Sequence, residues 1–204
     1  MTSEWGATKK HIPVLQEDVL SYLAVKPDGI YLDGTLGLGG HASAVQKQLS
    51  PKGQLVGFDG DEEAVRHCEK MLSPTCHLVQ APYDTFPQHL SSLSIQAVDG
   101  MLLDLGMSSY QLDTPARGFA YRTEGPLDMR FDENGPTTAR HIVNSWPVSE
   151  LKKLFKETGE GRRASAIATA IAKVRDSNPV DTTSDLTHII KSVVGAHAAT
   201  KTLS

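Results

Sequence analysis

A short apolar strand runs into a glycine-rich turn near the start of this chain, and that feature limits the fold more than any other. Residues 30–41 read Ile-Tyr-Leu-Asp-Gly-Thr-Leu-Gly-Leu-Gly-Gly-His. Glycines permit left-handed backbone and place no Cβ between the chain and a ligand, while free N–H groups at the start of the following helix face that ligand. The pattern indicates a site for a nucleotide-type cofactor.

Further apolar runs extend this pattern along the first half of the chain. Four segments have the composition of buried strands, and amphipathic helical patterns separate them: 30–33, 55–59, 77–80 and 98–105. Strands that alternate with helices form parallel sheets covered on both faces. The sequence therefore predicts an α/β fold.

Acidic residues end or closely follow three of the predicted strands. Asp33 precedes the first glycine, Asp59 ends the second strand, and Asp104 lies at the end of the fourth. Carboxyl ends of parallel strands share one edge of the sheet, where Asp59 is placed to accept hydrogen bonds from a ribose diol. Asp33 suits an ammonium group and would repel a pyrophosphate, which favours S-adenosylmethionine over a dinucleotide. Bracing of the loop itself is the alternative role for Asp33 and for Asp59.

The segment that follows, residues 112–130, is rich in turn formers and mixes arginines with aromatic residues. It has neither helical nor strand periodicity, so we predict an ordered functional loop. Phosphates and a stacked base of RNA are expected ligands for Arg117, Phe119, Arg122 and Arg130. Ion pairs with neighbouring acidic residues are the alternative role for the arginines.

From Thr137 onward the patterns are helical. Thr138, Ser149 and Thr183 are predicted N-caps, and a further helix is expected over 163–175. Residues 151–204 hold nine Lys and Arg against five Asp and Glu, a balance that suits a polyanionic partner as well as a solvated surface. We predict a cofactor-binding α/β domain over 1–113, followed over 114–204 by the loop and an all-helical substrate-recognition insertion.

The composition argues against several classes of function. The chain has no run of about eighteen apolar residues and no apolar stretch of a signal peptide at its start, so we expect no membrane association and a cytoplasmic location. Cys68 and Cys76 form no Cys-x-x-Cys pair, which predicts free thiols and no metal site. No Pro-Cys pair is present for covalent attack on a cytosine ring.

Taken together, several stretches resemble the bacterial 16S rRNA cytosine-N4 methyltransferase family called RsmH or MraW. The matching stretches are 11–15, 33–41, 59–61, 102–113, 117–119 and 125–130, within a resemblance that covers about His11 to Thr202. The last three are the most specific, because a generic methyltransferase does not share them. The resemblance implies a Rossmann-like class I methyltransferase sheet, an inserted all-helical subdomain, and N4 methylation of a cytidine in 16S rRNA of the small ribosomal subunit.

The resemblance also implies residue roles. Tyr83 would lie near the adenine of S-adenosylmethionine, and the assignment of Gln111 rests on the family almost alone. For His41 the alternative role is that of a residue at the start of a helix that bonds its own loop. Asp104 is the expected catalytic residue as well as a cofactor ligand. The predicted cofactor-binding set is Asp33, Gly37, Gly39, Gly40, His41, Asp59, Tyr83, Asp104 and Gln111.

Departures from the family accompany these matches. Gly60 stands where relatives usually have Arg, and the family continues beyond the last matching stretch with further strands. We therefore expect a C-terminally truncated chain, an incomplete sheet and an uncovered sheet edge, which is prone to association and makes a homodimer one expected form. A non-catalytic cofactor- or RNA-binding module and a nicotinamide-dependent oxidoreductase are the alternative functions.

Overall fold

The structure is a computed structural model that describes residues 13–195. Residues 11–12 of the matching stretch 11–15, and the end of the resemblance beyond residue 195, lie outside the described residues. The chain forms two compact units that divide between Gly106 and Met107, seven residues before the boundary predicted at 113. Each unit is described by itself.

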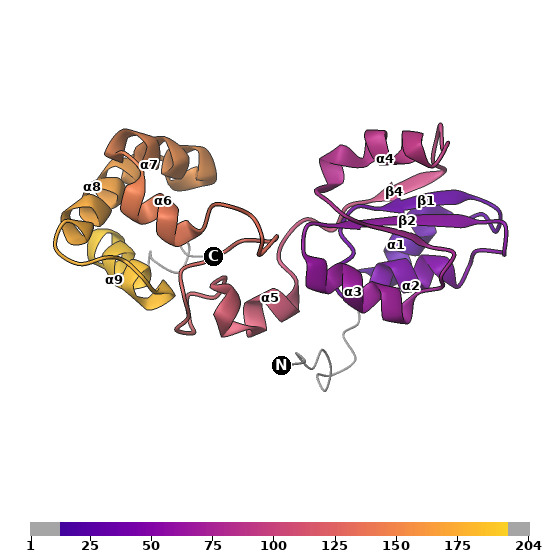
Figure 1. Ribbon diagram of the computed structural model, residues 1–204, viewed down its shortest axis with the longest axis horizontal. Helices are drawn as coiled ribbons and strands as arrows, with labels where there is room; N and C mark the ends of the chain where they lie inside the picture. Colours follow the sequence, from indigo (N-terminus) through magenta and orange to yellow (C-terminus); the bar gives the residue numbers. More distant parts are fainter. Residues whose placement is uncertain (1–12, 196–204) are drawn as a thin grey trace. The chain divides into compact units, whose positions relative to one another are not determined.

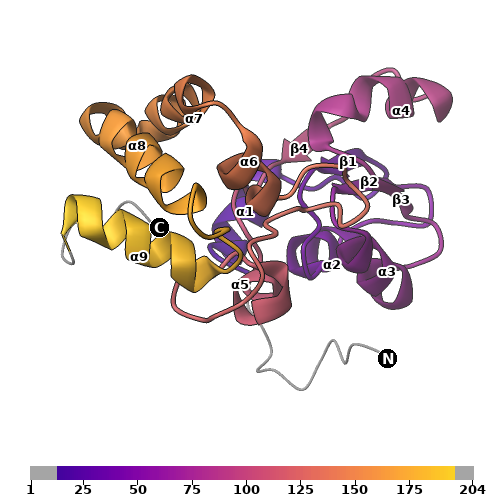
Figure 2. The same cartoon turned by 60° about the vertical axis from the view of Figure 1, so that its left-hand side comes forward.

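The first unit contains a four-stranded, wholly parallel sheet (Figure 1). Its strands are β1 (Ile30–Asp33), β2 (Gln54–Asp59), β3 (His77–Gln80) and β4 (Gly100–Leu102), arranged in the order β3-β2-β1-β4. Figure 2 shows β3 beside β2. The predicted α/β fold is confirmed, and β4 is shorter than the predicted strand 98–105.

Helices cover both faces of this sheet, α2 (Gly40–Gln46) and α3 (Glu62–Met71) on one side and α4 (Phe86–Ser92) on the other (Figure 1). Helix α1 (Gln16–Leu23) adds Leu20 and Leu23 to the α2/α3 side. The two faces bury separate apolar clusters because strand side chains alternate between faces. Buried members are Tyr31, Leu36, Ala42, Val45, Leu55, Val65, Cys68 and Leu72 on the α2/α3 side, and Leu32, Val56, Phe58, Leu90 and Ile95 on the α4 side.

The order of the strands reverses beside β1. From β1 the chain adds β2 and then β3 on one side, and then returns to place β4 on the other side. Ligands of open parallel sheets bind outside the carboxyl ends of the strands at such a switch point. Asp33 ends β1 at this point, which locates the candidate site.

The second unit begins with α5 (Ser109–Asp113) and a 3-10 turn over Pro115–Arg117, continues as an irregular loop, and ends in four helices. These helices are α6 (Ala139–Ser145), α7 (Val148–Phe155), α8 (Ala164–Arg175) and α9 (Thr183–Val194). Their core includes Leu127 from the loop, Leu151, Ile167, Ile171 and Val180. The helical nature predicted for this part of the chain is confirmed.

Two predicted N-caps in this unit are wrong. Helix α7 begins at Val148 after Pro147, so Ser149 lies inside the first turn. Thr182, not Thr183, caps α9, because Asp185 three residues later completes a reciprocal capping box. The Thr183 hydroxyl instead donates to the Thr123 carbonyl and accepts from the Gly125 N–H, tying the loop to α9. The predicted Thr138 cap is confirmed.

Candidate functional site

The glycine turn after β1 packs tightly against α3. Gly39 has φ 71°, and a Cβ there would lie 2.4 Å from Met71 Cε and 2.8 Å from Cys68 Sγ. Cys68 is buried and free, and its Sγ lies 3.8 Å from the Gly37 carbonyl oxygen. Glycine is therefore required at position 39 for conformation and for space. The supporting role of the α3 side chains was not predicted, since the helical pattern shows only that one face of α3 is apolar.

Asp33 is the most constrained carboxylate of the site, with a relative exposure of 2%. One oxygen, Oδ1, accepts a hydrogen bond from the Thr35 N–H at 3.0 Å, and the buried Oδ2 has no hydrogen-bond partner. Burial, together with the nearby carboxylates of Asp59 and Asp104, raises the pKa of Asp33 to about 6, although the hydrogen bond from the Thr35 N–H opposes the rise. A carboxylate with an unpartnered buried oxygen offers a place for a cationic donor group.

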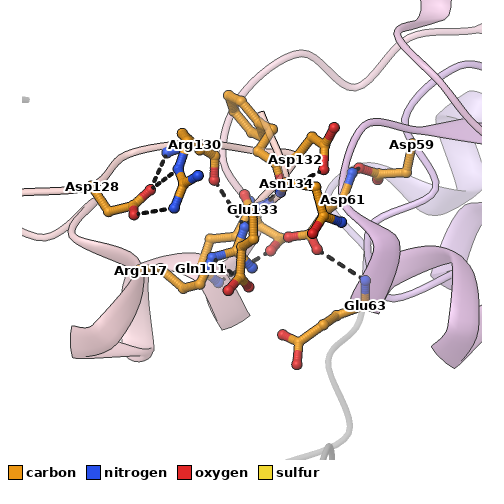
Figure 3. Close-up of polar contacts among 12 residues, drawn as sticks. Asp59, Asp61, Glu63, Gln111, Arg117, Asp128, Arg130, Asp132, Glu133 and Asn134 are labelled. Carbon is orange, nitrogen blue, oxygen red and sulfur yellow. Dashed lines mark hydrogen bonds and ion pairs between the residues drawn. The ribbon is translucent and has the colours of Figure 1, made fainter. Parts of the chain in front are cut away.

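Asp59 braces the turns on either side of it. Its Oδ2 accepts from the Gly37 N–H at 2.8 Å, and its Oδ1 accepts from the Asp61 N–H at 2.9 Å. Asp61 in turn caps α3 by accepting from the Glu63 N–H at 3.0 Å (Figure 3). The bracing role considered for Asp59 is therefore observed. A carboxylate has about four acceptor positions, so bracing and acceptance from a ribose do not exclude one another in principle.

Asp104 follows β4 at the same edge of the sheet. Its N–H donates to Thr35 Oγ1 at 2.8 Å, and its Oδ2 lies 3.7 Å from His41 Nε2. Thr35 thus bonds both Asp33 and Asp104, a link between β1 and β4 that sequence reasoning missed. Its position inside the glycine turn is the only signal that pointed to it.

Tyr83 begins a 3-10 turn after β3 and is partly exposed. Its Cβ would lie 3.0 Å from a Cβ placed on Gly34, so the tyrosine stands beside the glycine turn. The first unit therefore brings together eight of the predicted cofactor residues. They are Asp33, Gly37, Gly39, Gly40, His41, Asp59, Tyr83 and Asp104.

Gln111 belongs to the second unit, where it is buried in α5. Its Oε1 accepts from the Ser108 N–H at 3.0 Å, and its own N–H donates to Ser108 Oγ at 3.2 Å. This capping box fixes the start of α5, and the spacing Ser-x-x-Gln is a signal from which the helix could have been predicted. The cofactor role of Gln111 stays a prediction.

Arg117 is enclosed within its own loop, with a relative exposure of 4%. Its Nη2 donates to the carbonyl oxygens of Arg130 and Phe131, both at 3.0 Å, and its Nε lies 3.3 Å from a Glu133 carboxylate oxygen. The guanidinium also lies 6.0 Å from the ring centroid of Phe119, which is only 8% exposed. These contacts match the ion-pair alternative for Arg117, and they leave little of Phe119 available for stacking.

Arg130 is paired within the same loop (Figure 3). It forms a bidentate pair with Asp128, at 2.8 Å and 2.7 Å, and donates to the Gly135 carbonyl at 2.7 Å. The Asp128 pKa is lowered, chiefly by its hydrogen bond from Arg130. Arg122 differs, because its side chain is exposed and contacts the neighbouring Tyr121. Contact of these arginines with RNA stays a prediction.

Other features of the described residues do not point to a second site of the predicted kind. A cavity of about 430 Å³ lies between α3, β3 and α4, and none of the predicted site residues lines it. Within residues 13–195, no three His, Cys, Asp or Glu side chains are grouped so as to hold a metal ion. No helix in that same range is both long and apolar enough to span a membrane.

The residues present fit a cationic nucleoside cofactor. Three carboxylates lie around a turn of bare backbone at the switch point of a parallel sheet, and Asp33 Oδ2 is buried without a partner. An anionic edge of this kind attracts an ammonium or a sulfonium and repels a pyrophosphate. The fold and the site define a Rossmann-like cofactor-binding protein.

The chain belongs to the MraW methylase family, whose model matches residues 8–204. The "Ribosomal RNA small subunit methyltransferase H" of Halothermothrix orenii is 47% identical over 194 residues, which are 94% of this chain and 62% of the relative. The protein with the same name from Caldicellulosiruptor saccharolyticus is 44% identical over 187 residues, 91% of this chain and 61% of the relative. The chain thus spans less than two thirds of the length of these curated relatives.

A solved structure titled "Crystal structure of a SAM dependent methyltransferase from Aquifex aeolicus" is also similar. It is 13% identical, with a TM-score of 0.25, over 71% of this chain and 79% of that one. A likeness this weak places no residue.

Proposed function

We propose that the protein uses S-adenosylmethionine to methylate N4 of a cytidine in small-subunit (16S) ribosomal RNA. The observation that carries the proposal is the cluster of Asp33, Asp59 and Asp104 around the glycine turn, with one buried carboxylate oxygen unpartnered. Membership of the MraW methylase family and the names of its relatives support the reaction and the substrate class.

Each residue of the cluster has a role in holding the cofactor. When bound, the cofactor supplies a methyl group on a positively charged sulfur. Asp33 Oδ2 would accept hydrogen bonds from the cofactor's ammonium, and Asp59 would accept from its ribose hydroxyls. Backbone at Gly39 and Gly40 permits close approach, and Tyr83 would lie along the adenine.

Transfer to a cytosine requires help from the protein because the N4 lone pair is delocalised into the ring. Acceptors placed at the amine hydrogens draw N4 towards tetrahedral geometry, and Asp104 with the carbonyls of Leu105 and Gly106 would supply them. Most of the rate gain would come from alignment of N4 with the methyl group, an effect worth roughly 7–11 kcal/mol in favourable cases. The target base must leave its stack, which costs least in single-stranded RNA.

The direct test is methylation of purified small-subunit rRNA by the protein, followed by nucleoside analysis. We expect N4-methylcytidine to accumulate in the presence of S-adenosylmethionine. Cofactor binding without any methylated product would contradict the enzyme and support a non-catalytic module. A methyl group at cytosine C5 would contradict the proposed role of Asp104.

A homodimer and a cytoplasmic location form part of the same proposal. Among residues 13–195, β4 pairs only with β1, and three apolar side chains on or just after this strand are exposed: Met101, Leu103 and Leu105. An open edge with apolar side chains favours pairing of two copies, and ribosomal RNA as substrate would place the protein in the cytoplasm.

Self-association can be measured by light scattering. We expect a dimer mass for the unchanged protein and a monomer mass for Met101→Lys, since a lysine on an edge strand opposes pairing. Lys47, exposed just beyond α2, provides a matched control as Lys47→Met, which should leave the mass unchanged. A monomer mass for the unchanged protein at every concentration would contradict the dimer.

A further inference from the structure

Two apolar side chains stand exposed on either side of Arg130. Met129 is 44% exposed and Phe131 is 45% exposed. Met129 has φ 63°, a left-handed conformation that is unfavourable for residues with a side chain other than Asn, Asp or His. Backbone strain of this kind persists only where surrounding contacts impose it, and it is common at ligand sites.

The ring of Phe131 is supported by the loop beneath it. Its centroid lies 5.2 Å from that of Phe119, with an angle of 49° between the ring planes. Phe119 is buried, so it holds Phe131 in place while the outer part of the Phe131 ring is left exposed. The backbone is fixed as well, because Arg117 Nη2 bonds the Phe131 carbonyl at 3.0 Å.

The same segment is fixed on both sides of the ring. The Met129 N–H donates to the Arg117 carbonyl at 3.0 Å, and Arg130 bonds both Asp128 and the Gly135 carbonyl. The backbone of the loop is also closely packed at Gly125, where a Cβ would lie 1.9 Å from the Pro115 carbonyl oxygen. The exposed side chains are therefore preorganised, which lowers the entropy cost of binding a ligand.

We propose that Phe131 and Met129 form a stacking site for one unstacked nucleobase of single-stranded RNA. The inference rests on the proposed function, because the substrate class comes from there. The charges nearby favour a base over a phosphate: Arg117 and Arg130 are paired inside the loop, and Asp132 and Glu133 follow the ring directly. An aromatic ring stacks on a base without needing a free cation. Phe131 thus takes the role predicted for Phe119.

The test measures binding of a labelled single-stranded RNA of about ten nucleotides by fluorescence anisotropy. For Phe131→Ala we expect binding about tenfold to hundredfold weaker, with S-adenosylmethionine binding unchanged. Phe131→Trp keeps a stacking surface and should bind within about threefold of the unchanged protein. Val174→Ala truncates an apolar side chain of α8 that is 39% exposed, and it should have no effect.

The variant Met129→Gly distinguishes an effect on RNA binding from an effect on folding stability. Glycine adopts φ 63° without strain, so the melting temperature should stay the same or rise while RNA binding weakens. Binding by Phe131→Ala within twofold of the unchanged protein would overturn the stacking site, as would equal losses in Phe131→Trp and Phe131→Ala. If the unchanged protein neither binds nor methylates RNA, both the proposed function and the stacking site are wrong. If the unchanged protein binds and methylates RNA and Phe131→Ala binds RNA equally well, only the stacking site is wrong.

Discussion

Replacing Asp104 by Asn should lower the rate of methyl transfer by about a hundredfold to a thousandfold, with the affinity for S-adenosylmethionine reduced less than tenfold. The carboxylate at this position is proposed to accept the hydrogens of the cytosine amine as N4 attacks. An amide keeps one acceptor oxygen but has no negative charge to stabilise the positive charge that develops on nitrogen. Single-turnover rates with saturating cofactor and rRNA give the measurement.

The fold should tolerate this change. The hydrogen bond from the Asp104 backbone N–H to Thr35 Oγ1 is kept in this variant, and the carboxylate that changes is exposed, with its Oδ2 3.7 Å from His41 Nε2. Asp99, at the other end of β4, offers a matched control, because it bonds Lys26 and the Ile30 N–H away from the carboxyl edge. Asp99→Asn should leave the rate unchanged. A rate for Asp104→Asn within threefold of the unchanged protein would show that Asp104 has no catalytic role.

Asp33→Asn should weaken S-adenosylmethionine binding by roughly thirtyfold or more, because it removes the buried charge that faces the cofactor's ammonium. The same change should make the variant more stable, relative to the unchanged protein, at neutral and alkaline pH than at acid pH. The Asn side chain can still accept from the Thr35 N–H through its Oδ1, so the local turn is kept. Calorimetric titration and thermal unfolding of the same samples measure both effects.

The pH dependence follows from the raised pKa of Asp33. Burial is the main cause that raises this pKa from its ordinary value of 3.8 to about 6, so the folded chain binds this proton more tightly than the unfolded chain. Stability due to the protonated carboxyl is complete below about pH 4 and is lost as the pH rises through about 6. As the pH rises from 4 to 8, the unfolding free energy of the unchanged protein should therefore fall by about 2–3 kcal/mol relative to that of Asp33→Asn.

Asp99→Asn again gives the contrast. The pKa of Asp99 is lowered, chiefly by its hydrogen bond from Lys26, so that carboxylate stabilises the fold above its unfolded pKa and the effect is lost on acidification. The stability difference for Asp99→Asn should thus stay constant between pH 4 and pH 8 and change only below about pH 4, whereas that for Asp33→Asn changes between pH 4 and pH 8. A stability difference for Asp33→Asn that stays constant from pH 4 to pH 8 would contradict the raised pKa.

Local sequence patterns predicted most of the strands of the first unit. The bounds of β1 and β3 agree with the predicted strands, and β2 is one residue longer, because apolar runs between turn formers identify buried parallel strands well. Placing Asp33, Asp59 and Asp104 at one edge needed only the rule that parallel strands share their carboxyl ends. The raised pKa of Asp33 was beyond sequence reasoning, since it depends on burial and on charges from two other strands.

Sequence reasoning was weaker in the loop of the second unit. Arginines beside aromatic residues suggested exposed RNA contacts, yet Arg117 bonds carbonyl oxygens thirteen and fourteen residues away and is buried. Which ring is exposed, Phe119 or Phe131, depends on that tertiary contact. The choice between Thr182 and Thr183 as N-cap likewise depended on the hydrogen bonds of Thr183 to residues 123 and 125.

The central claim is that the carboxylates at the strand ends form a site for a positively charged sulfur cofactor. Calorimetric titration of the purified protein with S-adenosylmethionine, and separately with NAD, tests it most directly. We predict saturable binding of S-adenosylmethionine that Asp33→Asn weakens, and no binding of NAD. Tight binding of NAD together with no binding of S-adenosylmethionine would contradict the account.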